Sequence, residues 1–150
     1  MKEIHTEIEI AAGPDVVWSV LTNFAAYPDW NPFLRTVAAE LRPGAPVALT
    51  VAVGARTLDV DARMIRVVPE REVRWAGPIS RLQAVVFRGE HYFAIEELAP
   101  GRVRFLHGER FGGISLPFIG GWMNRRLAPA YVAMNVALKR RAEMPLAVAR

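Results

Sequence analysis

Apolar and polar residues alternate with a period of two over most of the chain, and this pattern predicts β-strands. From position 3 to position 10, isoleucine or threonine occupies the even positions and glutamate or histidine the odd ones, which is typical of a strand with one buried face. The alternation returns after Phe33 and continues for some eighty residues, interrupted by turn signals such as Pro43-Gly44. We therefore expect seven strands, over residues 2–10, 34–41, 47–53, 58–68, 73–75, 84–97 and 102–111.

The strand expected over residues 58–68 changes parity along its length. Apolar residues occupy the even positions up to Met64, whereas Ile65 and Val67 are apolar at odd positions. One extra residue in this strand would account for the shift, so we expect a β-bulge near Met64.

A helical spacing of three and four residues replaces the alternation between the first two strands. Gly13-Pro14-Asp15 favours a helix start, because proline at the first position has no amide hydrogen bond to lose and aspartate complements the positive end of the helix dipole. The apolar residues that follow share one face: Val17, Val20, Leu21 and Phe24. A second short helical turn is expected over residues 25–30.

The C-terminal part of the sequence predicts a long amphipathic helix of some twenty residues. Its apolar face consists of Ile119, Met123, Leu127, Ala130, Met134, Ala137 and Leu138. Basic residues at 139–141 complement the negative end of the helix dipole. Pro129 removes one backbone hydrogen bond, so we expect a kink or a restart there.

The order of these elements indicates an α+β protein. Seven consecutive strands with tight turns favour one strongly curved antiparallel sheet, and the long C-terminal helix supplies the cover that such a sheet needs. The two short helices fall between strands one and two. A chain of 150 residues fits one domain, so we expect a single domain over residues 1–150.

Composition excludes several kinds of chemistry. The chain contains no cysteine, so it has neither disulfides nor thiolate nucleophiles. It also lacks a glycine-rich phosphate loop or another cofactor fingerprint, and no cofactor is expected. The net charge of +4 raises the question of nucleic acid, but acidic residues are interspersed among the arginines, as on a solvated sheet face. We expect no nucleic-acid partner.

The sequence also predicts where the protein resides. The N-terminal residues alternate between charged and apolar types and do not form the apolar segment of a secretory signal. The longest uncharged run, residues 111–124, is shorter than a bilayer-spanning helix and contains four glycines and a proline. We therefore expect a cytoplasmic protein without stable membrane insertion.

Short segments distributed over nearly the whole chain carry a family resemblance. They are Val17-Trp18, Tyr27–Phe33 (YPDWNPF), Pro43-Gly44, Arg74-Trp75, Gly89–Phe93, His107–Phe111, Met134-Asn135 and Leu138-Lys139. Together they resemble the SRPBCC superfamily, which includes START lipid-transfer domains, birch-pollen-type allergens and the bacterial polyketide cyclase/dehydrase group. The similarity is strongest to the small bacterial cyclase/dehydrase-like members. The resemblance implies a helix-grip fold with a deep, mostly apolar cavity between sheet and C-terminal helix.

Strand parity brings three polar residues to the concave face of the last two strands. His91, His107 and Glu109 share that face with several phenylalanines. A hairpin that pairs Ile95 with Phe105 is one register open to these strands. In that register His91 lies opposite Glu109, within reach of a cross-strand contact.

These three residues are the candidate catalytic groups. A carboxylate beside an imidazole in an apolar wall suits proton transfer near neutral pH, with His91 and Glu109 as acid and base and His107 polarising a carbonyl. The alternative is a buried, satisfied polar pair with a purely structural role. The usual ligand spacings of a metal site are missing, and no metal is expected.

Other residues are candidates for the cavity wall or for its entrance. The expected wall residues are Trp30, Met64, Trp75, Phe93, Phe105, Phe111, Tyr131, Met134 and Leu138, and the alternative for each is a place in the core, which is the more common one for residues at these spacings. The segment after the last strand is apolar but rich in glycine. It could act as a gate that moves at Gly112, Gly113, Gly120 and Gly121, or it could be only an irregular connection.

Three functions from different classes are compatible with these features. The first is a carrier or sensor that binds a hydrophobic small molecule, such as a lipid, a polyketide or an aromatic compound, in the cavity. The second is a polyketide cyclase/dehydratase-like enzyme that uses His91 and Glu109. The third is a protein-interaction module. The protein is expected to be a monomer or a homodimer.

Overall fold

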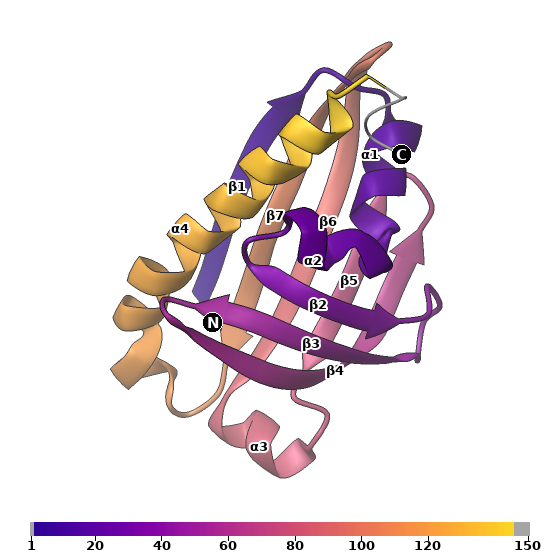
Figure 1. The fold of residues 1–150 in the computed structure, drawn as a ribbon. Coiled ribbons are helices and arrows are strands. Elements are labelled where there is room, and N and C mark those ends of the chain that lie inside the picture. The colour runs from indigo at the N-terminus through magenta and orange to yellow at the C-terminus, as the bar shows by residue number, and fades with distance from the viewer. Residues whose placement is uncertain (1, 146–150) are drawn as a thin grey trace.

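The computed structural model describes residues 2–145 and contains one seven-stranded sheet (Figure 1). The strands are β1 (Lys2–Ile10), β2 (Leu34–Ala39), β3 (Pro46–Val53), β4 (Arg56–Val68), β5 (Glu72–Gly77), β6 (Arg88–Ala99) and β7 (Arg102–Gly112). The helices are α1 (Pro14–Thr22), the 3₁₀ turn η1 (Phe24–Ala26), α2 (Tyr27–Trp30), α3 (Arg81–Val86) and α4 (Leu116–Ala142). All neighbouring strands pair antiparallel, in the order β1-β7-β6-β5-β4-β3-β2, which confirms the predicted α+β architecture.

The sheet curves around α4, as Figure 1 shows. The helix packs along β1 and β7 and also meets β3 near the other edge of the sheet, while α1 contacts both α4 and β6. The side chains between these layers form one buried cluster that includes Ile10, Leu21, Phe105 and Leu138. Within the described residues, no helix has an apolar stretch long enough to cross a bilayer.

The pairing of β6 with β7 confirms the register considered above. Ile95 pairs with Phe105, and His91 pairs with Glu109. The shift in register between β4 and β5 lies between Met64 and Arg66, where the change of parity predicted a bulge.

Two predicted boundaries were wrong. Residues 84–86 belong to helix α3 and not to the strand that follows, which begins at Arg88. A cap explains this helix, because the Ser80 hydroxyl accepts a hydrogen bond from the Gln83 amide at 3.4 Å. Helix α4 begins earlier than predicted, at Leu116, and continues through Pro129 without a restart. It therefore takes up most of the glycine-rich segment that was considered as a gate or as an irregular connection.

The YPDWNPF segment forms α2 and the entry into β2. The Tyr27 hydroxyl donates to the backbone carbonyl of Leu21, and the tyrosine side chain is fully buried. The side-chain oxygen of Asn31, Oδ1, accepts hydrogen bonds from the backbone amides of Phe33 and Leu34 at 3.0 and 2.9 Å. These bonds turn the chain into the strand. Phe33 is thereby held facing the interior, where it is 3% exposed.

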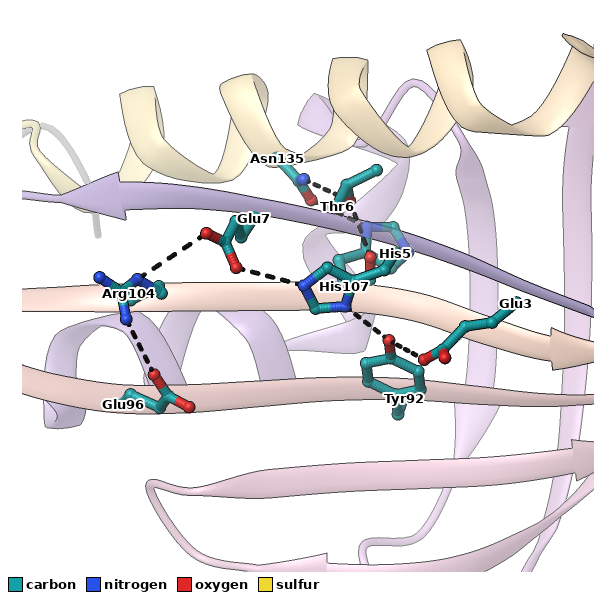
Figure 2. Close-up of polar contacts among 9 residues, drawn as sticks. All are labelled: Glu3, His5, Thr6, Glu7, Tyr92, Glu96, Arg104, His107 and Asn135. Carbon is teal, nitrogen blue, oxygen red and sulfur yellow. Dashed lines mark hydrogen bonds and ion pairs between the residues drawn. The ribbon is translucent and has the colours of Figure 1, made fainter. Parts of the chain in front are cut away.

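A tyrosine ties three strands together on the convex face of the sheet. Tyr92 of β6 reaches across Gly108 of β7 to β1, where its hydroxyl donates to Glu3 at 2.7 Å and meets Nδ1 of His5 at 2.8 Å (Figure 2). The ring occupies the space that a side chain at Gly108 would fill. The guanidinium of Arg74 lies 5.2 Å from the centre of the ring.

Candidate functional site

A cavity of about 800 Å³ lies between the sheet and the first half of α4. Strands β3 and β4 supply an aliphatic wall that includes Leu49, Val51 and Val60. The wall also has many aromatic residues, which are Phe33, Trp75, Phe87, Phe111, Trp122 and Tyr131. A cavity of this size can enclose most of a drug-sized molecule.

The wall residues that are also exposed mark the mouth of the cavity. The apolar ones are Leu58 beside the β3–β4 turn, Ile79 before α3 and Trp122 in α4, with exposed fractions of 55%, 42% and 51%. The polar ones are Asp59, Asp61, Ser80 and Gln83. The mouth therefore lies between the β3–β4 hairpin, α3 and the first turns of α4. These three elements lie near one another at the end of the molecule where α4 begins (Figure 1).

A polar cluster on the cavity wall consists of His91, Glu109 and Tyr131. Nδ1 of His91 lies 3.3 Å from Oε2 of Glu109, and the Tyr131 hydroxyl donates to the same oxygen. Trp75 and Phe33 both stack on the His91 ring, with centroid separations of 5.6 and 6.0 Å. Burial, and then the charge of Glu109, raise the pKa of Tyr131 well above its ordinary value, so this hydroxyl keeps its proton and remains a donor.

A second row of polar side chains supports His91 from behind. Nε2 of His91 lies 2.8 Å from Nε2 of His107, and Nδ1 of His107 lies 2.8 Å from the side-chain oxygen of Asn135. The Asn135 amide donates to the Thr6 hydroxyl at 2.8 Å, and this hydroxyl donates to the His107 carbonyl at 2.7 Å (Figure 2). The row thus connects β6, β7, α4 and β1.

The direction of these hydrogen bonds determines where the protons lie. The Asn135 oxygen is an acceptor, so Nδ1 of His107 carries a proton. Burial, and then His91, lower the pKa of His107 well below its ordinary value, so its ring is neutral and its Nε2 accepts a hydrogen bond from the Nε2–H of His91. The contact of Nδ1 of His91 with Oε2 of Glu109 is a hydrogen bond when one of the two atoms carries a proton.

The second carboxylate oxygen of Glu109 faces the cavity without a partner. Within residues 2–145, Oε2 takes the contacts of Tyr131 and His91, and no hydrogen bond reaches Oε1. A methyl group at Gly89 would collide with Oε1, so this glycine makes room for the carboxylate. Oε1 is therefore the atom of the cluster that is open to a hydrogen-bond donor or a proton from a bound molecule.

Some of the predicted wall residues line the cavity, and the others lie in the core. Trp75, Phe111 and Tyr131 line the cavity, as do His91 and Glu109. The others pack in the core away from the cavity: Trp30, Met64, Phe93, Phe105, Met134 and Leu138. His107 also lies behind the wall, with no exposed surface. Its place suits a positioning role and is too deep for contact with a ligand.

The four glycines of the candidate gate lie in two different environments. Gly112 is the last residue of β7 and Gly113 follows it, with a φ of 113°, a conformation that favours glycine. Gly120 and Gly121 lie inside α4. Movement of this segment remains a prediction.

Phe33, Thr6 and Asn135 were missed as site residues, although the sequence carries a signal for one of them. Tyr131, Met134, Asn135 and Leu138 follow the spacing of the buried face of α4, so Asn135 is an amide on an apolar stripe. A buried amide needs hydrogen-bond partners, and this need points to a polar neighbour in the fold. Thr6 and Phe33 carried no comparable signal.

Acidification should destabilise the protein through His107. The unfolded chain binds a proton at this histidine near pH 6.5, whereas the folded chain excludes it because burial, and then His91, lower the pKa of His107. The free energy of unfolding should therefore fall by about 1 kcal/mol over the first pH unit below 6.5, and this contribution is fully present above that pH. Denaturant titrations on either side of pH 6.5 measure the slope.

Two variants isolate the contribution of His107 to this slope. His107→Gln should lose this part of the pH dependence, whereas His5→Gln, which changes an exposed histidine, should keep it. An identical slope in His107→Gln and in the parent protein would contradict the assignment.

No metal position is formed within the described chain. Among residues 2–145, no group of three or more histidine, aspartate or glutamate side chains converges as metal ligands would. The close contacts of His91 and His107 are hydrogen bonds to each other, to Glu109 and to Asn135.

Comparison with known proteins identifies one family and several similar folds. The family described as polyketide cyclase/dehydrase and lipid transport matches residues 1–143. No curated protein matches the sequence. Among solved structures, the Zhui aromatase/cyclase from Streptomyces sp. R1128 has a TM-score of 0.76 at 18% identity, with 95% of this chain and 93% of that chain covered.

Two further structures share the fold. A START superfamily protein from Mycobacterium smegmatis has a TM-score of 0.74 at 20% identity, with 94% of this chain and 97% of that chain covered. Norcoclaurine synthase from Thalictrum flavum, in complex with dopamine and hydroxybenzaldehyde, has a TM-score of 0.68 at 16% identity, with 93% and 84% covered. At these identities the likeness shows the common fold alone.

Proposed function

Because this chain belongs to the polyketide cyclase/dehydrase and lipid transport family, within the SRPBCC superfamily, we propose that it binds an apolar, ring-containing small molecule as a carrier or sensor. The observation that carries the proposal is the cavity of about 800 Å³, with aliphatic and aromatic walls, a polar end at His91 and Glu109, and further polar residues at the mouth. Such a site gains affinity from apolar burial and orientation from a few polar groups.

The polar end also indicates the chemistry of the ligand. Oε1 of Glu109 is an acceptor, so the ligand should carry a hydroxyl or another hydrogen-bond donor at the end that enters first. Trp75 and Phe33 are positioned to pack against a flat ring system near His91. We therefore favour a phenol-like or enol-like end group on an aromatic or polycyclic molecule.

Extraction of the purified protein tests this proposal most directly. The protein would be isolated under mild conditions, denatured in organic solvent, and the extract searched by mass spectrometry for a stoichiometric apolar compound. Recovery of a ring compound with a hydroxyl group would support the proposal. An empty extract, together with no thermal shift on addition of polycyclic phenols and ketones, would contradict it.

A second candidate function, a cyclase/dehydratase-like enzyme, is favoured by the contact of His91 with Glu109 at 3.3 Å on the cavity wall. In this reaction Oε1 of Glu109 takes a proton from a carbon next to a ligand carbonyl, and the electrons of the C–H bond pass into the enolate. The His91–Glu109 pair keeps the proton and returns it to a later intermediate or to a leaving hydroxyl. His107 and Asn135 hold His91 in the required tautomer.

Glu109→Gln distinguishes the enzyme from the carrier. The amide keeps the size of the side chain but no longer accepts a proton, so an enzyme should lose about a hundredfold in kcat with a small change in KM. A carrier should lose only about tenfold in affinity, because the substitution weakens a single hydrogen bond to a charged group. Glu90→Gln is the matched control, because Glu90 pairs with Arg74 away from the catalytic pair. Unchanged turnover in Glu109→Gln would exclude Glu109 as the base.

A further inference from the structure

The mouth of the cavity is surrounded by an unusually apolar exposed surface. Its most exposed residues are Leu82 of α3 and Phe118 of α4, with exposed fractions of 81% and 88%. The surface is completed by Leu58, Ile79, Val85, Val86, Ile114 and Trp122, each at least 42% exposed. We call these eight residues the apolar rim.

Hydrogen bonds connect the end of α3 to the residues just before α4, so the rim residues of these two helices lie side by side. The amides of Ile114 and Ser115 donate to the carbonyls of Val85 and Val86, both at 3.0 Å. The Ser115 hydroxyl also donates to the Val86 carbonyl, at 2.7 Å. Helix α3 is thus held beside the start of α4, where both lie at one end of the molecule (Figure 1). Contiguous exposed apolar surfaces of this kind mark sites of association.

Five basic side chains lie around the rim, compared with two exposed aspartates at the mouth, Asp59 and Asp61. Arg81 is the first residue of α3, and Arg125 lies on α4 about one turn after Trp122, the last rim residue of that helix. The guanidinium of Arg126 lies near Gly54 in the β3–β4 turn. Lys2 and Arg88 lie against Gly120 and Gly112, and both line an open surface depression of about 500 Å³ beside the first turn of α4. This depression is roomy enough for a phosphate group between two cations.

These five cations differ from the arginines on the convex face of the sheet. Arg66, Arg74, Arg104 and Arg110 each form ion pairs with glutamates there. Within residues 2–145, none of the five rim cations forms an ion pair. Their charge is therefore available to an external anionic partner.

We propose that this end of the molecule docks on an anionic lipid bilayer. The apolar rim would enter the boundary between headgroups and acyl chains, and the five cations would contact lipid phosphates around it. A second copy of the chain fits less well, because two such faces in contact would bring like charges together. The mouth would then open directly onto the membrane, so an apolar ligand could pass between bilayer and cavity without crossing water.

Vesicle binding tests the docking surface. The protein should sediment with phosphatidylcholine vesicles that contain phosphatidylglycerol, and less with pure phosphatidylcholine vesicles. Phe118→Glu and Leu82→Glu should each lower the partition coefficient by roughly tenfold, because each removes a large apolar side chain and adds a negative charge. Val132→Glu is the matched control, since it changes an exposed valine of α4 outside the rim and should bind as the parent does.

A second pair of variants tests the cations. Lys2→Gln and Arg88→Gln should each reduce partitioning roughly fivefold on anionic vesicles and have no effect on neutral ones. Arg140→Gln, at the other end of α4, removes the same charge from an exposed position and should not change partitioning. Absence of binding to anionic vesicles would overturn the proposal, and so would equal binding by Phe118→Glu and the parent. A rim variant that changes only self-association would assign the rim to a second copy.

This outcome is separable from that of the proposed ligand site. Neither Leu82 nor Phe118 lines the cavity, so the rim variants should bind a ligand in solution as the parent does. Loss of vesicle binding with unchanged ligand affinity would support the docking surface alone.

Discussion

A protein with both Val60→Trp and Leu127→Trp is expected to fold and to lose ligand affinity by more than about a hundredfold. Val60 of β4 and Leu127 of α4 lie on opposite walls of the cavity, and both are half-buried. Half-buried positions leave room for the larger rings, so the indoles should enter the cavity without the strain of an overpacked core. A ligand that occupies this cavity would then collide with both rings.

The measurement is calorimetric titration with a compound recovered from the parent protein. Val132→Trp serves as the control, because it adds the same ring at an exposed position of α4 outside the cavity. Circular dichroism should show equal folding of both proteins. If the double variant bound the ligand as tightly as the control, the ligand would have to lie elsewhere on the molecule.

Gly108→Ala should lower the free energy of unfolding by on the order of 4 kcal/mol, the largest stability effect that we expect from a single methyl group. The added carbon would collide with the Tyr92 hydroxyl and with the backbone carbonyl of Ile4. A backbone atom cannot move aside without separation of β1 from β7. The tyrosine would also lose its contacts with Glu3 and His5.

Gly112→Ala is the matched control on the same strand. Its methyl group would meet only the end of the Arg88 side chain, which is flexible and exposed. Its effect on the midpoint of urea denaturation should be within about 0.5 kcal/mol of zero. Equal destabilisation by the two substitutions would show that loss of glycine, and not the collision, is what matters.

The sequence predicted the sheet and one side of the site well because alternation determines which face a side chain takes. His91, His107 and Glu109 lie on the concave face as expected, and the pairing of Ile95 with Phe105 brings two of them together. Helix α3 was missed because a short apolar run resembles a strand as much as a helix. In the structure this run is a capped helix whose apolar residues remain exposed.

The extent of the cavity could not be predicted from periodicity. Phe105 and Phe111 share one face of β7, yet the first is fully buried in the core and the second lines the cavity. Alternation gives the face of a strand but not the position along it at which the sheet bends away from α4. For the same reason Met134 and Leu138 pack in the core, while Met123 and Leu127, two to four turns earlier, line the cavity.

The cavity walls come from two sets of elements with different tasks. The polar end is held by His91 of β6, Glu109 of β7 and Tyr131 of α4, through hydrogen bonds that extend to β1. The aliphatic wall on β3 and β4 takes no part in those bonds. Substitutions in that wall can therefore change the size and shape of the accepted molecule while its polar end stays in place. In evolution or in design, the choice of ligand proposed for this cavity can therefore change while the cluster of His91, Glu109 and Tyr131 stays the same.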